Sequence, residues 1–568
     1  MDQPAAGQPK GAFFLVVFVV ILGLLGYAYF RMTAPSNTAQ QQQGQPGQPD
    51  GSNPAFQPGD HKDLQLVETQ TEVPSLGAPA TYQPKDDIHE IELSEYAGYA
   101  GIIVANGGLE PNENSVFGKK GLKLRIKISE EESWPALNGG KMMASATTAD
   151  VLAVYGKQFQ AVVPAQIGFS RGADGIVVRK EYKRVNALKG KTLVTSQFTE
   201  ADFFIRYLAG EASIGIHALP DLNTPPNAEK INLVYAEDAF KAGDVFLADI
   251  KSGKNRLAGC VTWDPRTTEV VKESGGKAHL LTSNKNLLIV ADILVVNKGF
   301  AQKSPDKVAA LVHGTLEGNR MVRDNPDVHL DTIAKAFNKQ DSKWDRSKAK
   351  AELAKVHLSN LPENLAFFSG AIDMAGSFGS IYQSAIIAYG SELIKDPVDS
   401  DRFADLQHLN KLKESGEFKD QQIAIAPIRA ANEARLETDP LLSRDIRFLF
   451  QPNSAVLELT NNDNIQNLEA IRRLLKVSPG STILLRGHVD DSMVDEFRRQ
   501  GGEALVNKMA LEAVELSKKR ANEIKNLLIT RLQADPKRLE TIGLGWREPV
   551  GASAEQKRRV EVQWFTVE

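Results

Sequence analysis

The sequence predicts an α/β protein with two folded domains, preceded by one transmembrane helix. Three observations lead to this class. Residues 11–30 are an uncharged apolar run, short apolar runs then alternate with helix-like stretches over residues 86–396, and a strand-and-helix pattern starts again near residue 444. A chain of 568 residues is too long for one hydrophobic core, so several domains are expected.

The overall composition excludes some functional classes. The net charge is −4 at pH 7, whereas a nucleic-acid-binding domain carries a basic surface, so we expect no nucleic-acid partner. The single cysteine, Cys260, excludes an intramolecular disulfide and a metal site made of cysteines alone. Because the sequence has no phosphate-binding loop and no H-E-x-x-H motif, we expect no cofactor and no metal.

The apolar run GAFFLVVFVVILGLLGYAYF is predicted to be a membrane anchor. It has twenty residues, which is long enough to cross the hydrocarbon core as a helix. A cleaved signal peptide, the alternative, usually has a shorter apolar region followed by small residues. We expect an anchor at residues 11–31, a short cytoplasmic tail at residues 1–10, and a disordered Gln-, Pro- and Gly-rich linker at residues 32–85.

Residues 86–396 are predicted to form the larger α/β domain, with a largely parallel sheet. Pro305 follows Ser304 near the start of a mostly helical region, and residues 397–441 are interpreted as a helical connector. Apolar runs predicted as strands occupy residues 101–105, 122–128, 175–178, 192–195 and 287–296.

Residues 442–568 are predicted to form a small βαβαβ domain. Apolar residues alternate at 446, 448 and 450 and again at 560, 562 and 564, as in strands, and residues 482–485 form a third strand. Helical spacing appears at residues 465–475 and 514–529.

Four segments of this second domain resemble the OmpA-like peptidoglycan-binding family. They are RGHVD (486–490), LSKKRANEI (516–524), GLGWREP (543–549) and KRRVEV (557–562). The resemblance implies that Asp490 and Arg520 bind the diaminopimelate of the peptidoglycan stem peptide. Such a ligand carries an ammonium and a carboxylate on one carbon, which a carboxylate and a guanidinium would meet. A solvated arginine and a loop aspartate are the alternative.

The sequence also departs from the family pattern. Val489 stands where Ser or Thr is usual, Ala513 stands where Asn is common, and a long charged loop is predicted after Asp490. His488 is expected to pack or cap rather than to bind a metal, because no partner ligands lie at a useful spacing.

Residues 99–316 resemble periplasmic solute-binding proteins of the nitrate, sulfonate and taurine type, within the phosphate-like superfamily. The resemblance rests on NGGLEPNENS, LNGGKMMASATTADVL, IGFSRGADGIVV, ALKGKTLVTSQFTEADFFIRYL, AGCVTWDP and SPDKVAALV. It implies a bilobed periplasmic-binding-protein-like domain that closes on a ligand. The ligand would be a small molecule, with an anion as one option.

Ligands of open α/β sheets bind at the carboxyl ends of strands, and helix starts there can hold an anion. Each of the polar residues at such places could instead be a helix cap, and Trp263 could belong to the hinge core rather than stack on a ligand. The candidate solute-binding residues are Asn106, Gly107, Thr147, Thr148, Ser196, Gln197 and Trp263, with Gly108, Ser145, Thr199 and Asp264 beside them.

Enzymatic and motor functions are disfavoured. GFSRG at residues 168–172 fits a nucleophile elbow, but a strand rather than a helix is predicted to follow it. The cysteine-rich motif of a related pyrimidine-synthase branch is missing, and the apolar run lacks the ionisable group that an ion-driven stator needs.

The predicted function is therefore that of a non-enzymatic binding protein. It would be a single-pass inner-membrane protein with its bulk in the periplasm. It would bind peptidoglycan and a small solute, in the manner of an ABC-transporter substrate-binding protein that serves a membrane transporter. The alternative is an envelope scaffold or sensor whose solute-binding domain no longer serves transport.

Overall fold

The computed structural model describes residues 64–129, 132–338, 343–370, 376–425, 440–451 and 454–566. The predicted anchor at residues 11–31 and most of the predicted linker lie outside these residues. Within them, no helix combines the length and the apolar character needed to cross a bilayer.

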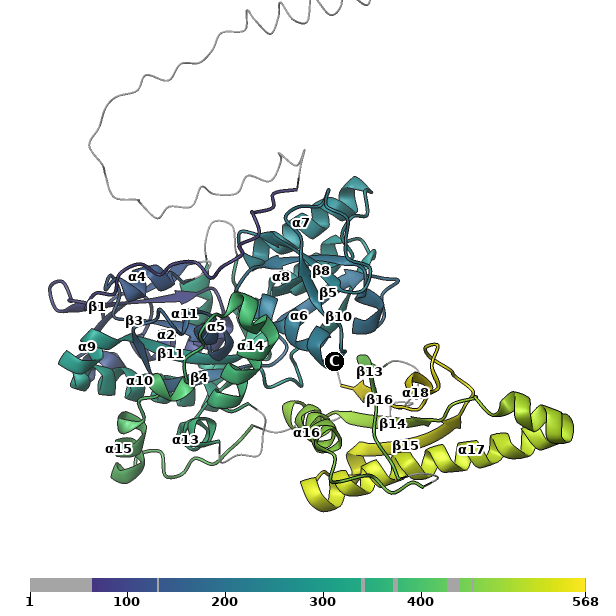
Figure 1. The fold of residues 1–568 in the computed structure, drawn as a ribbon. Coiled ribbons are helices and arrows are strands. Elements are labelled where there is room, and N and C mark those ends of the chain that lie inside the picture. Colours follow the sequence, from purple (N-terminus) through teal and green to yellow (C-terminus); the bar gives the residue numbers. More distant parts are fainter. Residues whose placement is uncertain are drawn as a thin grey trace, which may run out of the picture. The chain divides into compact units, whose positions relative to one another are not determined.

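The larger domain has two α/β lobes, each with a mixed six-stranded sheet among the described residues (Figure 1). In the first lobe the strand order is β12 (Val356–Leu358), β4 (Ala161–Ser170), β11 (Ala291–Asn297), β3 (Ala144–Thr148), β1 (Ile88–Ser94) and β2 (Lys123–Ser129). In the second lobe it is β10 (Ala278–Ser283), β5 (Asp174–Arg179), β9 (Gly259–Trp263), β6 (Thr192–Ser196), β8 (Ile231–Ala236) and β7 (Ile216–Ala218).

Both sheets are covered by helices on their two faces, which explains why their strands read as continuous apolar runs. In β11, Ile293 and Val295 join one core cluster while Leu294 and Val296 join another. Second-lobe helices are α6 (Glu200–Glu211), α7 (Ala239–Ser252) and α8 (Arg266–Glu273). First-lobe helices are α2 (Ala100–Asn106), α3 (Val116–Lys119), α4 (Trp134–Asn138), α5 (Ala149–Tyr155), α9 (Lys298–Lys303), α10 (Pro305–Asp324), α11 (Pro326–Phe337), α12 (Arg346–Leu353), α13 (Leu361–Ser369) and α15 (Gln407–Ser415).

The chain passes between the lobes at two adjacent places, from β4 to β5 and from β10 to β11. After this return, α14 (Phe378–Leu393) packs against α5 of the first lobe and α6 of the second. The α/β class and the bilobed architecture predicted from the sequence are therefore confirmed. The sheets are mixed rather than largely parallel, because β11 and β5 run antiparallel to their neighbours.

Two predicted elements of this domain are wrong. Residues 101–105 belong to helix α2, which is buried along its whole length, and a short apolar run cannot distinguish such a helix from a strand. The described end of the predicted linker, residues 64–85, lies against the folded domain. Val67 bridges Tyr235 of β8, and Leu76 is 2% exposed.

The C-terminal domain has a sheet ordered β13 (Leu442–Ile446), β16 (Val560–Phe565), β14 (Thr482–His488) and β15 (Leu539–Gly545). Helices α16 (Asn462–Val477), α17 (Val494–Leu532) and the short α18 (Ala554–Lys557) complete it. The predicted βαβαβ pattern lacked β15. The predicted loop after Asp490 is mostly the first part of α17, which is kinked at Gly501 and Gly502.

Candidate functional site

The two crossings between the lobes are tied together at the bottom of a cleft by a buried polar cluster. Asp174, the first residue of β5, accepts hydrogen bonds from the Ser170 hydroxyl and from Asn284 Nδ2, the latter at 2.8 Å. The Asn284 side-chain oxygen in turn accepts from the backbone N–H groups of Gly172 and Asp174, at 2.7 and 3.2 Å. The hinge strands therefore place a carboxyl group at the cleft.

The cleft is lined by both lobes and holds a cavity of about 50 Å³. Its lining combines carboxyl, hydroxyl and aromatic side chains, and within the part of the chain that the structure describes it includes no lysine or arginine. The lining residues are Ser94, Tyr96, Tyr99, Glu132, Trp134, Thr147, Thr148, Val151, Ser170, Asp174, Phe198, Thr199, Glu200, Trp263, Val290 and Asp292.

Burial raises the pKa of three carboxyl groups of this lining. It raises the pKa of Glu132 to about 7 and that of Asp174 to about 6. The pKa of Asp292 is raised well above its ordinary value by burial and then by the carboxyl groups of Asp174 and Glu132. Low local dielectric disfavours the charged form, and neighbouring acids add to this effect.

Three of the predicted solute-binding residues, Thr147, Thr148 and Trp263, line the cleft. Thr147 and Thr148 end β3, where α5 begins, and Trp263 ends β9 and packs against Phe240 at 5.5 Å. Thr199 lines the cleft as well. Its hydroxyl donates to the Ser196 carbonyl at 2.9 Å and makes no capping hydrogen bond to α6.

The other four predicted residues do not line this cavity. Asn106 and Gly107 end helix α2 rather than a strand, and the Asn106 amide donates to the carbonyls of Gly108, Glu110 and Leu124. Their role is structural: Asn106 is fully buried and Gly107 has a left-handed φ of 73°.

Ser196 ends β6 and Gln197 follows it, as predicted, but neither lines the cavity. The Gln197 side chain exchanges two hydrogen bonds with the Gln70 backbone, at 2.8 and 2.9 Å. The acidic lining was not predicted from the sequence. Asp292, within the apolar strand ADILVVN, was the detectable signal, because a carboxyl in such a strand is costly to bury.

In the C-terminal domain, the structure brings Asp490 and Arg520 together. Asp490 follows β14, and Arg520 lies on α17 with its guanidinium 5.0 Å from the Phe450 ring centroid and its Nε donating to the Ser454 carbonyl at 3.2 Å. Burial lowers the pKa of Arg520, the Arg558 cation lowers it further, and the Asp490 carboxylate opposes this.

Arg558, which the sequence analysis did not single out, belongs to the same group. It precedes β16 within the KRRVEV segment, and its Nε lies 3.4 Å from Asp490 Oδ2. The side chain of Asp490 is 18% exposed and that of Arg558 is 51% exposed. The Asp490 carboxylate therefore pairs with Arg558, and both charges act on the guanidinium of Arg520.

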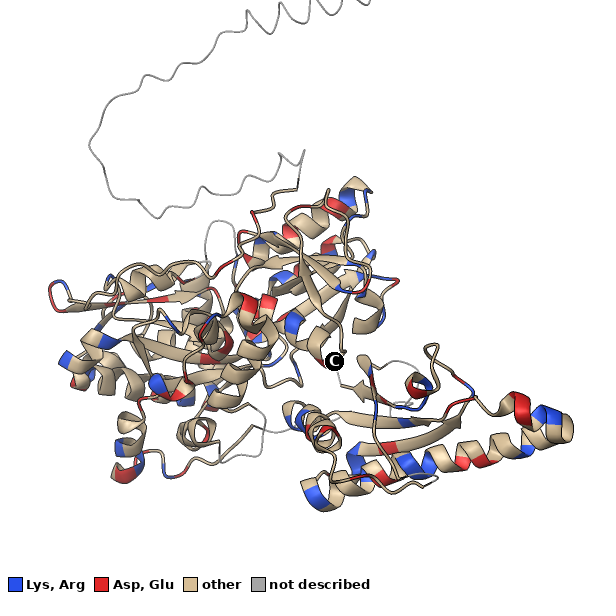
Figure 2. Cartoon of the chain, in the orientation of Figure 1, with Lys and Arg blue, Asp and Glu red and all other residues tan. Residues whose placement is uncertain are grey.

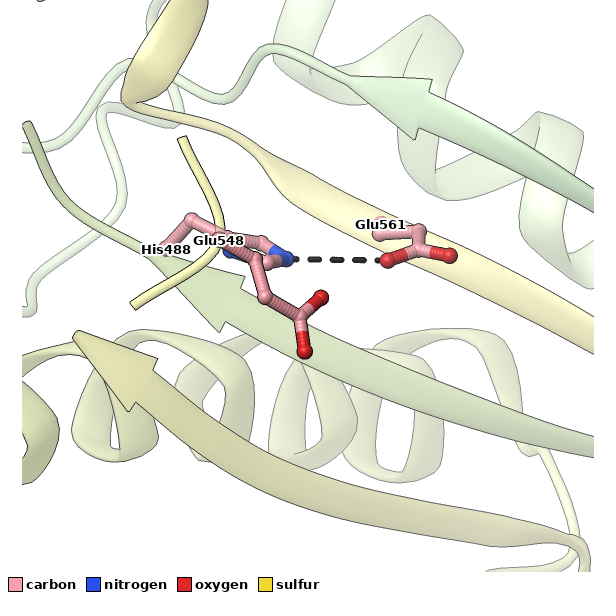
Figure 3. A group of neighbouring side chains, drawn as sticks. All are labelled: His488, Glu548 and Glu561. Carbon is pink, nitrogen blue, oxygen red and sulfur yellow. Dashed lines mark ion pairs between the residues drawn. The ribbon is translucent and has the colours of Figure 1, made fainter. Parts of the chain in front are cut away.

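His488, Glu548 and Glu561 are close enough to raise the question of a metal site (Figure 3). His488 Nε2 lies 3.6 Å from Glu561 Oε2 on the neighbouring strand. However, Arg486 already contacts Glu561 at 2.5 Å and both oxygens of Glu548 at 3.0 Å. Because a guanidinium neutralises both carboxylates, the group is an ion-pair network rather than a vacant cation site.

Residues 449–563 match the OmpA family. The C-terminal domain is an OmpA-family domain. A search of the curated proteins found no match.

Solved structures similar to this chain include a ligand-binding component of an ABC-type import system from Staphylococcus aureus, with zinc bound. It is 14% identical, covers 57% of this chain and 98% of its own, and has a TM-score of 0.41. The alkanesulfonate-binding protein SsuA from Xanthomonas axonopodis pv. citri, bound to MOPS, is 12% identical over 57% of this chain and 100% of its own, with a TM-score of 0.42. The desulfurization enzyme DszB is also similar, at 12% identity over 58% and 100% of the two chains and a TM-score of 0.36.

Proposed function

We propose that this chain is a non-enzymatic protein of the bacterial envelope that binds peptidoglycan through its OmpA-family domain and a small solute in the cleft of its bilobed domain. The observation that carries the first half is the group formed by Asp490, Arg520 and Arg558. A zwitterionic stem residue would place its ammonium on Asp490 and its carboxylate on a guanidinium.

The geometry supports this assignment through the way Arg520 is held. Its guanidinium lies over the Phe450 ring and its Nε donates to the Ser454 carbonyl, so the plane of the guanidinium is fixed before a ligand arrives. A fixed fork loses less conformational entropy when it binds a carboxylate. Arg558 is more exposed and adds a second cation beside Asp490.

Binding of the purified full chain to isolated sacculi tests the assignment. Asp490→Ala and Arg520→Ala are each expected to weaken binding about tenfold or more, because each removes a charge-assisted contact. Arg520→Lys keeps the charge but loses the planar fork, so it should also bind more weakly. Arg499→Ala is the matched control, since that side chain is 75% exposed and its described contacts are local, to Glu496 and to the Asp495 carbonyl. Unchanged binding in both alanine variants would refute the assignment.

The second half of the proposal is supported by the cleft itself. It lies between two lobes joined by two crossing segments, and its lining comes from both. Such a cavity can close on a ligand by rotation about the crossings. A thermal-shift screen of the full chain with anions, cations and neutral solutes tests it. If no class of solute raises the melting temperature, solute binding is refuted and the scaffold alternative is favoured.

The proposed location in the envelope rests on peptidoglycan binding and on the apolar run at residues 11–30. Peptidoglycan lies outside the cytoplasm, so the proposed binding requires export of the OmpA-family domain, and the uncharged run at residues 11–30 would keep the chain in the inner membrane. Delivery of the bound solute to a membrane transporter is the corresponding role for the bilobed domain. A reporter fused after the last residue should be active only in the periplasm, and cytoplasmic activity would overturn this topology.

A further inference from the structure

The charge of the cleft points to the chemical class of its ligand. This inference rests on the proposed function of the cleft as a solute-binding site. Four acidic residues contribute to the lining, namely Glu132, Asp174, Glu200 and Asp292. Figure 2 shows basic and acidic residues interspersed over the helices and loops of the bilobed domain, so the one-sided charge is a property of the cleft rather than of the whole domain (Figure 2).

In one of these carboxyl groups, only one of the two oxygens has a hydrogen-bond partner among the described residues. Asp292 is 3% exposed, and its Oδ1 accepts a hydrogen bond of 3.4 Å from the Tyr99 hydroxyl. Its Oδ2 has no hydrogen-bond partner among the described residues. A buried acceptor without a donor destabilises the protein, because the group has lost its hydrogen bonds to water. A ligand that supplies a donor at this oxygen would therefore remove that penalty when it binds.

Basic side chains on neighbouring elements are engaged elsewhere. Lys355 Nζ lies 2.8 Å from Asp264 Oδ2, and Arg206 Nε lies 2.7 Å from Asp202 Oδ1. Neither is part of the cavity lining. An anionic ligand would therefore meet the carboxyl groups without a countercharge, whereas a cation would favour their ionised form and pair with it.

Aromatic rings complete the environment. Tyr96 and Tyr99 pack edge to face with centroids 5.3 Å apart, and Trp134, Phe198 and Trp263 also line the cavity. The faces of such rings attract cations and also provide apolar contact for a carbon skeleton.

A bare metal ion fits this cavity less well than an organic cation. In the described part of the chain, the residues grouped closely enough to chelate an ion are His488, Glu548 and Glu561, which are outside the cleft. We propose that the cleft binds a small organic cation, with its ammonium group at Asp292 and Asp174 and its carbon skeleton against the aromatic rings.

Isothermal titration of the full chain with two matched sets of probes tests this proposal. The cations are putrescine, spermidine, choline and phenethylamine, and the anions are ethanesulfonate, MOPS and nitrate. We expect at least one cation to bind, and Asp292→Asn to weaken that binding about tenfold or more, because it removes a charge-assisted contact. Asp401→Asn, at an exposed position of the same lobe, should leave binding unchanged.

The outcomes separate this inference from the proposed function. Binding of an anion but of no cation would overturn the inference and leave solute binding standing. Equal binding of a cation by the parent and Asp292→Asn would also overturn it. Because Asp292→Asn could perturb folding, Asp174→Asn is measured in parallel, and both variants are checked by their melting temperatures. Failure of every probe in this titration and of every solute in the thermal-shift screen, neutral solutes included, would refute both proposals.

Discussion

Replacing Asp150 by asparagine should make the bilobed domain more stable at neutral and alkaline pH. Asp150 is in the first turn of α5, is fully buried, and has no hydrogen-bond partner at either carboxylate oxygen among the described residues. Burial raises its pKa from 3.8 to about 7. Asparagine has nearly the same shape and carries no charge to bury.

The size and sign of the effect follow from proton linkage. Between pH 4 and pH 7 the folded state holds a proton on Asp150 that the unfolded chain has lost. The free energy of unfolding therefore falls as pH rises through this window and levels off above it. The difference between 3.8 and about 7 corresponds to at most about 4 kcal/mol, and relaxation and water entry reduce it to roughly 2 kcal/mol.

Urea unfolding of the full chain at pH 4.5, 6 and 8, followed by tryptophan fluorescence, measures this difference. Asp150→Asn should gain about 2 kcal/mol over the parent between pH 4.5 and pH 8. Asp401→Asn, at an exposed position, should follow the parent at every pH. The electrostatic explanation fails if the difference between Asp150→Asn and the parent is the same at all three pH values.

Two further predictions concern packing and the lobes. A Cβ atom at Gly318 would lie 1.9 Å from the Gly101 carbonyl oxygen, so Gly318→Ala should lower the free energy of unfolding by about 1–3 kcal/mol. Gly210→Ala, where a Cβ atom meets nothing within 4 Å, should not lower it. A melting curve unchanged by Gly318→Ala would show that α2 and α10 can separate at little cost in free energy. Lys355→Ala removes the 2.8 Å contact between Lys355 Nζ and Asp264 of the other lobe. Amide hydrogen exchange at the crossing segments should then be about fivefold faster, which corresponds to about 1 kcal/mol. Equal exchange rates in the parent and the variant would exclude this ion pair as a restraint on lobe opening.

The sequence predicts best where the structural signal is local. β5 and β6 coincide with predicted strands because buried strands read as short apolar runs, and α16 shows helical spacing. Asp490 and Arg520 were identified because the motifs that carry them lie within short segments. Their proximity in the structure agrees with that prediction, while their role in binding stays a prediction.

The features that could not be predicted from the sequence depend on burial and on contacts between distant segments. Helix α2 was predicted as a strand because all its residues are buried, which removes the polar face that gives a helix its period. β1 was missed because charged residues such as Glu90 and Glu92 interrupt its apolar pattern. The acidic cleft joins Glu132, Asp174 and Asp292 from three separate segments, and only the paired lobes bring them together.

The two candidate sites differ in whether the charge of their carboxyl group is compensated by a protein cation. In the OmpA-family domain, Asp490 has Arg558 at 3.4 Å, so its charge is compensated before any ligand arrives. In the cleft, Asp292 has acidic neighbours and a buried oxygen with no hydrogen-bond partner among the described residues, so its ionisation is unfavourable until a positive charge enters. Binding of the proposed cation would then be coupled to ionisation, and the cation would stabilise a closed arrangement of the lobes more than an open one in which water solvates the carboxylate. The cleft therefore has the physical basis for a ligand-dependent change of conformation, whereas the compensated site can hold its ligand without one.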